Sequence, residues 1–142
     1  MALTLNDRSR FDPEHPSLSI PLYRCVNGEQ ALAFLFRRDP YTNPENAPRP
    51  GLVLLDLNLP GTDGREVLCQ IKRDKNLKTI PVIVFTTSSS PNDIESCYQK
   101  GANSYIIKPI NFNQLKQSIQ TILDFWFTAN TPPIDLSEAG AS

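Results

Sequence analysis

Three polar residues, each at the end of an apolar run, are the strongest candidates for chemistry in this sequence. They are Asp56, Thr86 and Lys108. An aspartate can attack phosphorus as a nucleophile and form an acyl phosphate. A neighbouring hydroxyl and ammonium would supply the hydrogen bond and the positive charge that phosphoryl transfer requires. We therefore interpret the three residues as a candidate site for handling phosphate.

Each residue also has an ordinary structural explanation when it is taken alone. An aspartate after a strand is commonly a turn or helix-capping residue, and threonine is a good strand former. A lysine before proline is commonly a solvated charge. These explanations weaken jointly, because ligands of parallel α/β sheets bind beyond the carboxyl ends of the strands. Three strand ends would otherwise have to place complementary groups on one edge by chance.

The apolar patterns predict the elements that position these residues. Unbroken apolar runs such as 52–55 and 81–85 are typical of strands buried on both faces of a parallel sheet. Strand and helix patterns alternate with short loops, which predicts an α/β fold with right-handed crossovers. We expect strands at 18–26, 52–55, 81–85 and 104–107, and helices at 29–38, 65–74, 91–100 and 111–127.

Polar residues on the predicted helices have simple interpretations. Ser90 is a good N-cap, Pro91 suits the first helical position, and Asp93 could close a capping box. Arg65, together with Lys72 and Arg73, lies on a polar helix face, and we interpret these side chains as ordinary solvated charges.

Composition excludes several classes of protein. The 142 residues are enough for one domain, which we expect at 18–128 between polar tails at 1–17 and 129–142. The net charge of -1 gives no electrostatic reason to expect nucleic acid or a membrane surface as a partner. No stretch has the roughly 18 apolar residues of a membrane span. We expect a cytoplasmic protein without a separate output domain.

The three candidate segments resemble those of response-regulator receiver domains (the CheY-like family). The resemblance covers about residues 20–128 and rests on LLDLNLP at 54–60, IPVIVFT at 80–86 and GANSYIIKP at 101–109. It implies a flavodoxin-like, doubly wound parallel sheet. The proline-rich loop before residue 52, the segment 61–68 and Phe125-Trp126 are similar to small stand-alone regulators paired with cyanobacterial phytochromes. The implied partner is therefore a sensor histidine kinase, for which a phytochrome is a candidate.

The resemblance also implies a role for each residue of the site. Asp56 would be the phosphoacceptor, Lys108 a contact to the phosphate, and Thr86 a switch hydroxyl. Three further expectations concern the neighbours of these residues: Tyr105 as an aromatic switch that turns inward, Thr87 as the small residue beside the switch hydroxyl, and a cis bond before Pro109.

A Mg²⁺ ion is implied as well, with Asp56 and the main-chain carbonyl of Asn58 among its ligands. Receivers, however, begin with a strand ending in two acids and then a helix, and this unit is not found. Leu3-Thr4-Leu5 is too short for it, and no buried-strand run precedes Asp7, Asp12 or Glu14. Without that strand, backbone groups in the middle of the sheet would lack partners. A misassigned or frameshifted start, a strand supplied by a second chain, and a degenerate receiver are three explanations.

Our leading hypothesis is a non-enzymatic regulator that accepts phosphate from a phosphohistidine onto Asp56 and signals through protein contacts. The apolar end of the last helix, at 125–127, favours a homodimer through that helix. A second hypothesis is a pseudo-receiver that acts as a binding module without taking phosphate. A haloacid-dehalogenase-like phosphatase is a third. That chemistry usually requires a second aspartate as acid and base two residues after the nucleophile, and this position is Asn58.

Overall fold

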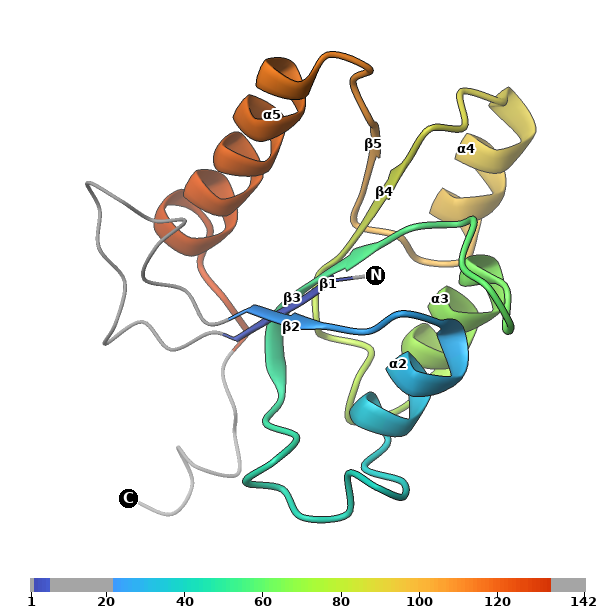
Figure 1. Cartoon of the computed structure of the whole chain (residues 1–142), viewed down its shortest axis with the longest axis vertical. Helices are drawn as coiled ribbons and strands as arrows, with labels where there is room; N and C mark the ends of the chain where they lie inside the picture. Colours follow the sequence, from blue (N-terminus) through green and yellow to red (C-terminus); the bar gives the residue numbers. More distant parts are fainter. Residues whose placement is uncertain (1, 6–21, 134–142) are drawn as a thin grey trace.

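The computed structural model describes residues 2–5 and 22–133, in which strands and helices alternate (Figure 1). The elements are β1 Ala2–Leu5, β2 Leu22–Arg24, α2 Gly28–Leu35, β3 Pro50–Leu55, α3 Gly64–Arg73, β4 Val82–Thr86, α4 Pro91–Gln99, β5 Ser104–Ile107 and α5 Phe112–Asp124, followed by the π-helical turn η2 Phe125–Ala129. The predicted elements are present from β2 onward, with bounds shifted by a few residues. No helix in the described residues is long and apolar enough to cross a membrane.

The five strands form one sheet in the order β2-β1-β3-β4-β5. Strands β3, β4 and β5 are parallel, with Val53 opposite Val82 and Thr86 opposite Ile107. This is the strand order of flavodoxin-like folds, in which ligands bind beyond the carboxyl ends of the strands. The predicted α/β class and parallel sheet are therefore confirmed, and residues after β3, β4 and β5 share one edge.

Strand β1 lies within the segment that we expected to be a polar tail, and for residues 2–5 it corrects that expectation. It lies between β2 and β3 and runs antiparallel to both, with Ala2 opposite Arg24 and Leu54. The physical reason is that the facing backbone groups of β2 and β3 need partners, which even four residues can supply in part. The end of β1, Leu5, lies opposite Pro50, at the end of β3 away from Asp56. Asp7, Asp12 and Glu14 lie outside the described residues.

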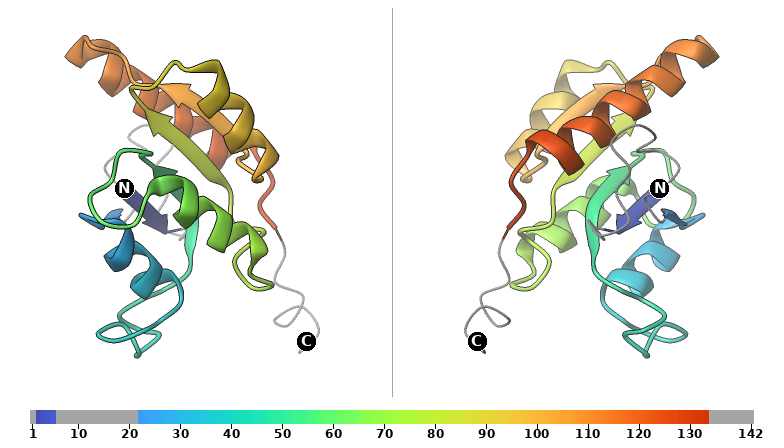
Figure 2. Two further views of the ribbon diagram at one scale, coloured as in Figure 1. Left: turned by 90° about the vertical axis from the view of Figure 1, so that its right-hand side faces the viewer. Right: turned by 90° about the vertical axis from the view of Figure 1, so that its left-hand side faces the viewer.

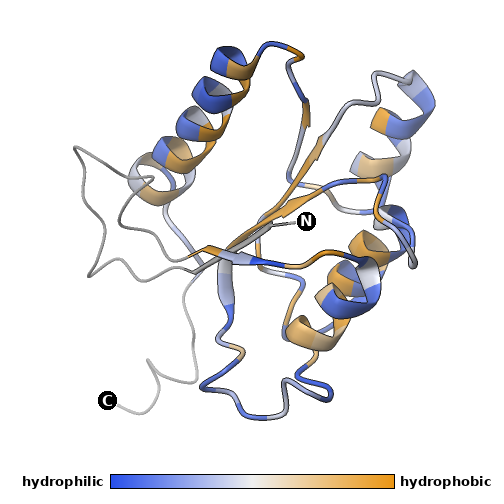
Figure 3. Ribbon diagram, in the orientation of Figure 1, coloured by the Kyte–Doolittle hydropathy of each residue, from blue (hydrophilic) through white to orange (hydrophobic). Residues whose placement is uncertain are grey.

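The core has two layers because side chains of a strand alternate between the faces of the sheet. Figures 1 and 2 show α5 on one face and α2, α3 and α4 on the other. One layer packs against α5 and η2 and comprises Leu52, Leu54, Ile83, Phe85, Ile122, Leu123 and Phe127. The other layer includes Val53, Leu55, Val82 and Val84 with side chains of the three opposite helices. Figure 3 shows the hydrophobic colour on the central strands, with both colours on the helices.

Asparagine side chains cap α5 and α2, whereas the serine expected to cap α4 does not. The side chains of Asn111 and Asn27 accept hydrogen bonds from backbone N–H groups at the starts of α5 and α2. Ser90 occupies the N-cap of α4, but its side chain makes no capping hydrogen bond. Asp93 does not close a capping box; its carboxylate instead accepts from Ser88 and Arg65. A guanidinium is the stronger partner for a carboxylate, because charge-assisted hydrogen bonds exceed neutral ones.

Lys72 is not the solvated charge that we expected. Its Nζ donates to the carbonyl oxygens of Lys78 and Ile80, at 3.0 and 2.8 Å, and to Asn103 Oδ1 at 2.9 Å. Burial lowers the pKa of Lys72 to about 8. The side chain thus joins α3 to the loops that lead into β4 and β5. Its long aliphatic stem makes this possible while the ammonium keeps three acceptors.

Candidate functional site

Asp56 and Lys108 meet at the carboxyl edge of the sheet. Asp56 is the first residue after β3, and Lys108 is the first after β5. Lys108 Nζ lies 2.6 Å from Asp56 Oδ2, and the two side chains are 30% and 26% exposed. The pair is therefore half-buried but accessible from one side, as a group that receives a ligand must be.

Hydrogen bonds hold Asp56 in its charged form. Burial by itself opposes ionisation, but hydrogen bonds from Lys108, the Asn58 backbone and Thr86 outweigh it, so the pKa of Asp56 lies below its ordinary value. The Asn58 N–H donates to Asp56 Oδ1 at 3.0 Å. Thr86 is fully buried at the end of β4. The ionised carboxylate can act as a nucleophile, and the ammonium and hydroxyl beside it are donors of the kind that stabilise a transferred phosphoryl group.

The backbone of Lys108 continues the β4–β5 pairing beyond β5. Its N–H donates to the Thr86 carbonyl at 2.7 Å, and its Nζ lies 5.6 Å from the centroid of the Phe85 ring. The expected cis bond before Pro109 is wrong, because within the described residues only the Asp39–Pro40 bond is cis. An X-Pro bond favours trans by about 0.5–1 kcal/mol, and the trans bond here is compatible with the contact between Lys108 and Asp56.

The first turn of α3 packs directly on the backbone of Asp56. A Cβ atom on Gly64 would lie 2.4 Å from the Asp56 carbonyl oxygen and 2.8 Å from Leu57 Cα. Both neighbours are backbone atoms, which cannot rotate away as a side chain can. The absence of a side chain at Gly64 therefore lets α3 approach the candidate acceptor.

We expect Gly64→Ala to destabilise the fold by about 1–3 kcal/mol, the usual cost of overpacking. Alanine should gain about 0.5–1 kcal/mol in a helix over glycine, but the clash with the Asp56 carbonyl is larger. Chemical denaturation measures the change, with Glu66→Ala, an exposed position in the same turn, as the control. A Gly64→Ala protein as stable as the wild type would contradict the close approach.

Thr87 is the first residue of the β4–α4 loop, and Tyr105, in β5, contacts that loop. The Tyr105 hydroxyl donates to the Ser88 carbonyl at 2.9 Å, and its ring packs partly buried against the core. Burial also raises the pKa of Tyr105. Thr87, by contrast, is exposed. The aromatic side chain thus contacts the loop that follows Thr86.

Arg65, Asp93 and Ser88 are site neighbours that sequence reasoning missed. Arg65 Nη2 donates to Asp93 Oδ1 at 2.7 Å, and the Ser88 hydroxyl donates to Asp93 Oδ2 at 2.7 Å. Arg65 was expected to be a solvated charge, and Asp93 a capping residue. The two are 28 residues apart, so no local pattern joins them. Ser88 has no sequence signal of its own, and the position of Asp93 in the first turn of α4 indicates only a capping residue.

The resemblance implies a magnesium ion with Asp56 and the Asn58 carbonyl among its ligands. Within the described residues, no group of three or more His, Cys, Asp or Glu residues could hold a metal ion. Asp56 is the carboxylate at this edge, and its oxygens already accept from Lys108 and Asn58. Carboxylate and carbonyl oxygens are chemically right for Mg²⁺, but the number of acidic ligands falls short of the implied pair.

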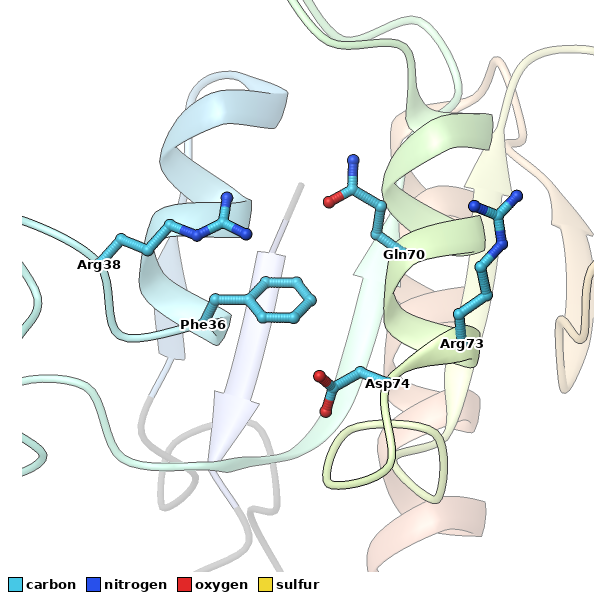
Figure 4. Close-up of a pocket in the computed structure, with 5 residues that line it drawn as sticks. All are labelled: Phe36, Arg38, Gln70, Arg73 and Asp74. Atoms are coloured by element: carbon cyan, nitrogen blue, oxygen red, sulfur yellow. The ribbon is translucent and has the colours of Figure 1, made fainter.

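A pocket in the described residues lies away from Asp56, between the ends of α2 and α3 (Figure 4). Phe36, Arg38, Gln70, Arg73 and Asp74 line it. These residues stand at the carboxyl ends of the two helices, whereas Asp56 contacts the start of α3. We assign this pocket no role in the chemistry of Asp56.

Comparison with known proteins identifies the family. The sequence model of the Response regulator receiver domain matches residues 24–120, the span that contains all three candidate residues. The chain belongs to the response-regulator receiver family. The predicted resemblance is thereby confirmed, and the phosphatase hypothesis is set aside. The match begins at Arg24, the last residue of β2, so β1 lies outside it.

Relatives place this receiver near regulators of cyanobacterial phytochromes. Response regulator Rcp1 of Synechocystis sp. is 46% identical over 107 residues, which cover 75% of this chain and 71% of that protein. The structure of phosphorylated RcpA, a cyanobacterial phytochrome response regulator, superposes with a TM-score of 0.74 at 45% identity and covers 78% and 76% of the two chains. The Mn²⁺-bound form of Rcp1 has a TM-score of 0.71 at 45% identity, with 76% of each chain covered.

Proposed function

We propose that this receiver accepts a phosphoryl group from the phosphohistidine of a sensor kinase onto Asp56. The contact of 2.6 Å between Lys108 Nζ and Asp56 Oδ2 carries the proposal. It places a compact positive charge beside the nucleophile at the edge where β3, β4 and β5 all end. The similarity to Rcp1 and to phosphorylated RcpA supports the same reading.

The side chains divide the work of transfer between them. A carboxylate oxygen of Asp56 forms the new bond to phosphorus while the bond from phosphorus to the histidine nitrogen breaks. Lys108 can follow the negative charge from the carboxylate to a phosphoryl oxygen, since its stem is flexible. Thr86 offers a hydroxyl at the neighbouring strand end. The protein contributes positioning and charge neutralisation, the main requirements of phosphoryl transfer.

We further propose Mg²⁺ as the cation of this site, because one relative was solved with Mn²⁺ bound. Asp56 and the Asn58 carbonyl would hold it, and it would neutralise charge on the phosphoryl group. The described residues give this ion fewer acidic ligands than the resemblance implies, so the metal is tested as a separate variable.

Intact-mass measurement of the wild-type chain with acetyl phosphate tests the function. We expect the mass to rise by one phosphoryl group in the presence of Mg²⁺, and peptide mapping to place it in the segment containing Asp56. A parallel sample with a chelator tests the metal. An unchanged mass in a folded wild-type protein would remove the phosphoacceptor proposal for this chain.

A pseudo-receiver is the second candidate function. The observation that favours it is that no group of three or more His, Cys, Asp or Glu residues in the described part of the chain could hold a metal ion. In that case the domain would bind its partner without taking phosphate. A folded protein with no mass change and no Mg²⁺-dependent shift in its amide NMR spectrum would favour this candidate over the phosphoacceptor.

Signal output is proposed to be a change in protein contacts rather than turnover of a substrate. Phosphorylation adds charge at Asp56 and can reorder nearby loops, including the one that Tyr105 contacts.

We propose a phytochrome-type kinase as the partner, a cytoplasmic location, and a homodimer through α5. The half-exposed Phe125 ring, packed edge-on to Trp126, supports the dimer. Sedimentation equilibrium with and without the phosphodonor measures the dimer directly.

A further inference from the structure

The Arg65–Asp93 ion pair connects the first turns of α3 and α4, the helices that follow β3 and β4. Arg65 Nε and Nη2 donate to Asp93 Oδ1, at 3.2 and 2.7 Å. Arg65 Nη1 also contacts both oxygens of Asp63, at 3.2 and 3.0 Å. One guanidinium therefore joins the start of α3 to the start of α4, which lie on the same face of the sheet (Figures 1 and 2).

The α3 end of this connection is held against the candidate acceptor. Asp63 is the N-cap of α3, and its side chain accepts from the Arg65 N–H at 2.7 Å. The next residue, Gly64, contacts the Asp56 backbone so closely that a side chain would clash. Arg65 is thus one residue from a direct contact with Asp56, and a shift of the acceptor loop would move it.

The α4 end of the connection holds Ser88. Asp93 Oδ1 takes the guanidinium, and Asp93 Oδ2 accepts from the Ser88 hydroxyl. The Ser88 carbonyl is the acceptor of the Tyr105 hydroxyl, and the Ser88 N–H points toward Thr86 Oγ1 at 3.5 Å. A movement of Ser88 would therefore change its hydrogen bonds with both Tyr105 and Thr86.

We propose that Arg65 and Asp93 are positioning residues. They hold Ser88, and through it Thr86 and Tyr105, in a fixed position relative to the loop that contains Asp56. The inference rests on the proposed function for its effect on phosphoryl uptake. An isolated, fully exposed ion pair contributes little to stability. Here, however, the side chains of Arg65 and Asp93 are only 31% and 23% exposed. Two guanidinium donors share Asp93 Oδ1 and the Ser88 hydroxyl donates to Oδ2, so the pair is part of a hydrogen-bond network, which orders side chains more than a single pair does.

Fluorine NMR of the fluorotyrosine-labelled full chain tests the positioning without any phosphate. The chain has four tyrosines, and Tyr105→Phe assigns the signal of interest. We expect Arg65→Gln and Asp93→Asn to displace the Tyr105 signal, and Arg65→Lys to restore it in part. Arg73→Gln, on the same helix, is the control and should leave it in place. A wild-type Tyr105 signal in both Arg65→Gln and Asp93→Asn would overturn the proposal.

Uptake kinetics test the link to the acceptor. We expect Arg65→Gln to take up phosphate from acetyl phosphate about threefold more slowly than wild type, consistent with loss of one partly exposed ion pair. An uptake rate equal to that of Arg73→Gln would overturn the link between the pair and Asp56. If the wild type takes up no phosphate, the proposed function fails, while the tyrosine signals still decide whether the pair positions Tyr105.

Discussion

Replacing Asp56 with asparagine is expected to abolish phosphoryl uptake from acetyl phosphate. Asparagine has nearly the same shape as aspartate, but its amide is not the carboxylate nucleophile that forms an acyl phosphate. Lys108 and Thr86 could still bind the negatively charged phosphodonor, but no carboxylate oxygen would be present at position 56 to accept the phosphoryl group. Intact mass after incubation with the phosphodonor measures the effect, and no mass gain is expected at times when the wild type is saturated.

Asp124→Asn is the matched control for this change. Asp124 ends α5, is exposed, and lies outside the group of residues that contacts Lys108. The control should take up phosphate at the wild-type rate. Equal uptake by Asp56→Asn and wild type would place the modification on a different residue and would contradict the assignment of Asp56.

The same substitution should change how stability depends on pH. The pKa of Asp56 is lowered in the folded protein, so its carboxylate contributes stability above the unfolded pKa of about 3.9. That contribution is lost as the pH falls through the lower, folded pKa, because between the two pKa values the unfolded chain binds more protons than the folded one. The difference in unfolding free energy between wild type and Asp56→Asn should therefore shrink in acid below about pH 4.

Replacing Lys108 with methionine is expected to slow phosphoryl uptake by about 100-fold, the usual effect of removing one fixed donor from a developing negative charge. Methionine keeps most of the length of the side chain and removes the ammonium that lies 2.6 Å from Asp56. The acceptor itself remains, so slow uptake should persist, unlike in Asp56→Asn. Time courses of intact mass give the two rates.

Lys108→Met should also raise the pKa of Asp56. Burial of that carboxyl would remain, while the Lys108 hydrogen bond and charge that oppose it would be gone. Carbon NMR of the Asp56 carboxyl measures this change. Lys116→Met, which removes an exposed lysine from α5, should alter neither the rate nor the titration. A normal uptake rate in Lys108→Met would show that the ammonium does not stabilise the transferred group.

Much of the candidate site could be predicted from local sequence. Unbroken apolar runs identified β3 and β4, and the residues that follow such strands in a parallel sheet share one edge. Asp56, Thr86 and Lys108 were placed on that edge for this reason, and the structure brings Asp56 and Lys108 into contact. The argument needs only periodicity and strand direction, both of which short segments of sequence determine.

Tertiary packing decided the partners of the charged side chains. Arg65 and Asp93 stand on different helices, 28 residues apart, and their types suggested only a solvated charge and a capping residue. Their pairing depends on how α3 and α4 lie together on the sheet, which no local pattern encodes. The same holds for Lys72, whose ammonium finds its acceptors in the loops that precede β4 and β5.

The sequence by itself determined the alternation of strands and helices from β2 onward and the polar residues at the strand ends, because hydrophobic periodicity and strand ends are local properties. Only the tertiary structure decided that Ala2–Leu5 pairs antiparallel between β2 and β3, and that the Lys108–Pro109 bond is trans. Only it joined the loop of Asp56 to that of Thr86 through Arg65. These features depend on hydrogen bonds and ion pairs between segments that are distant in the sequence. Such partners come together only once the chain has folded.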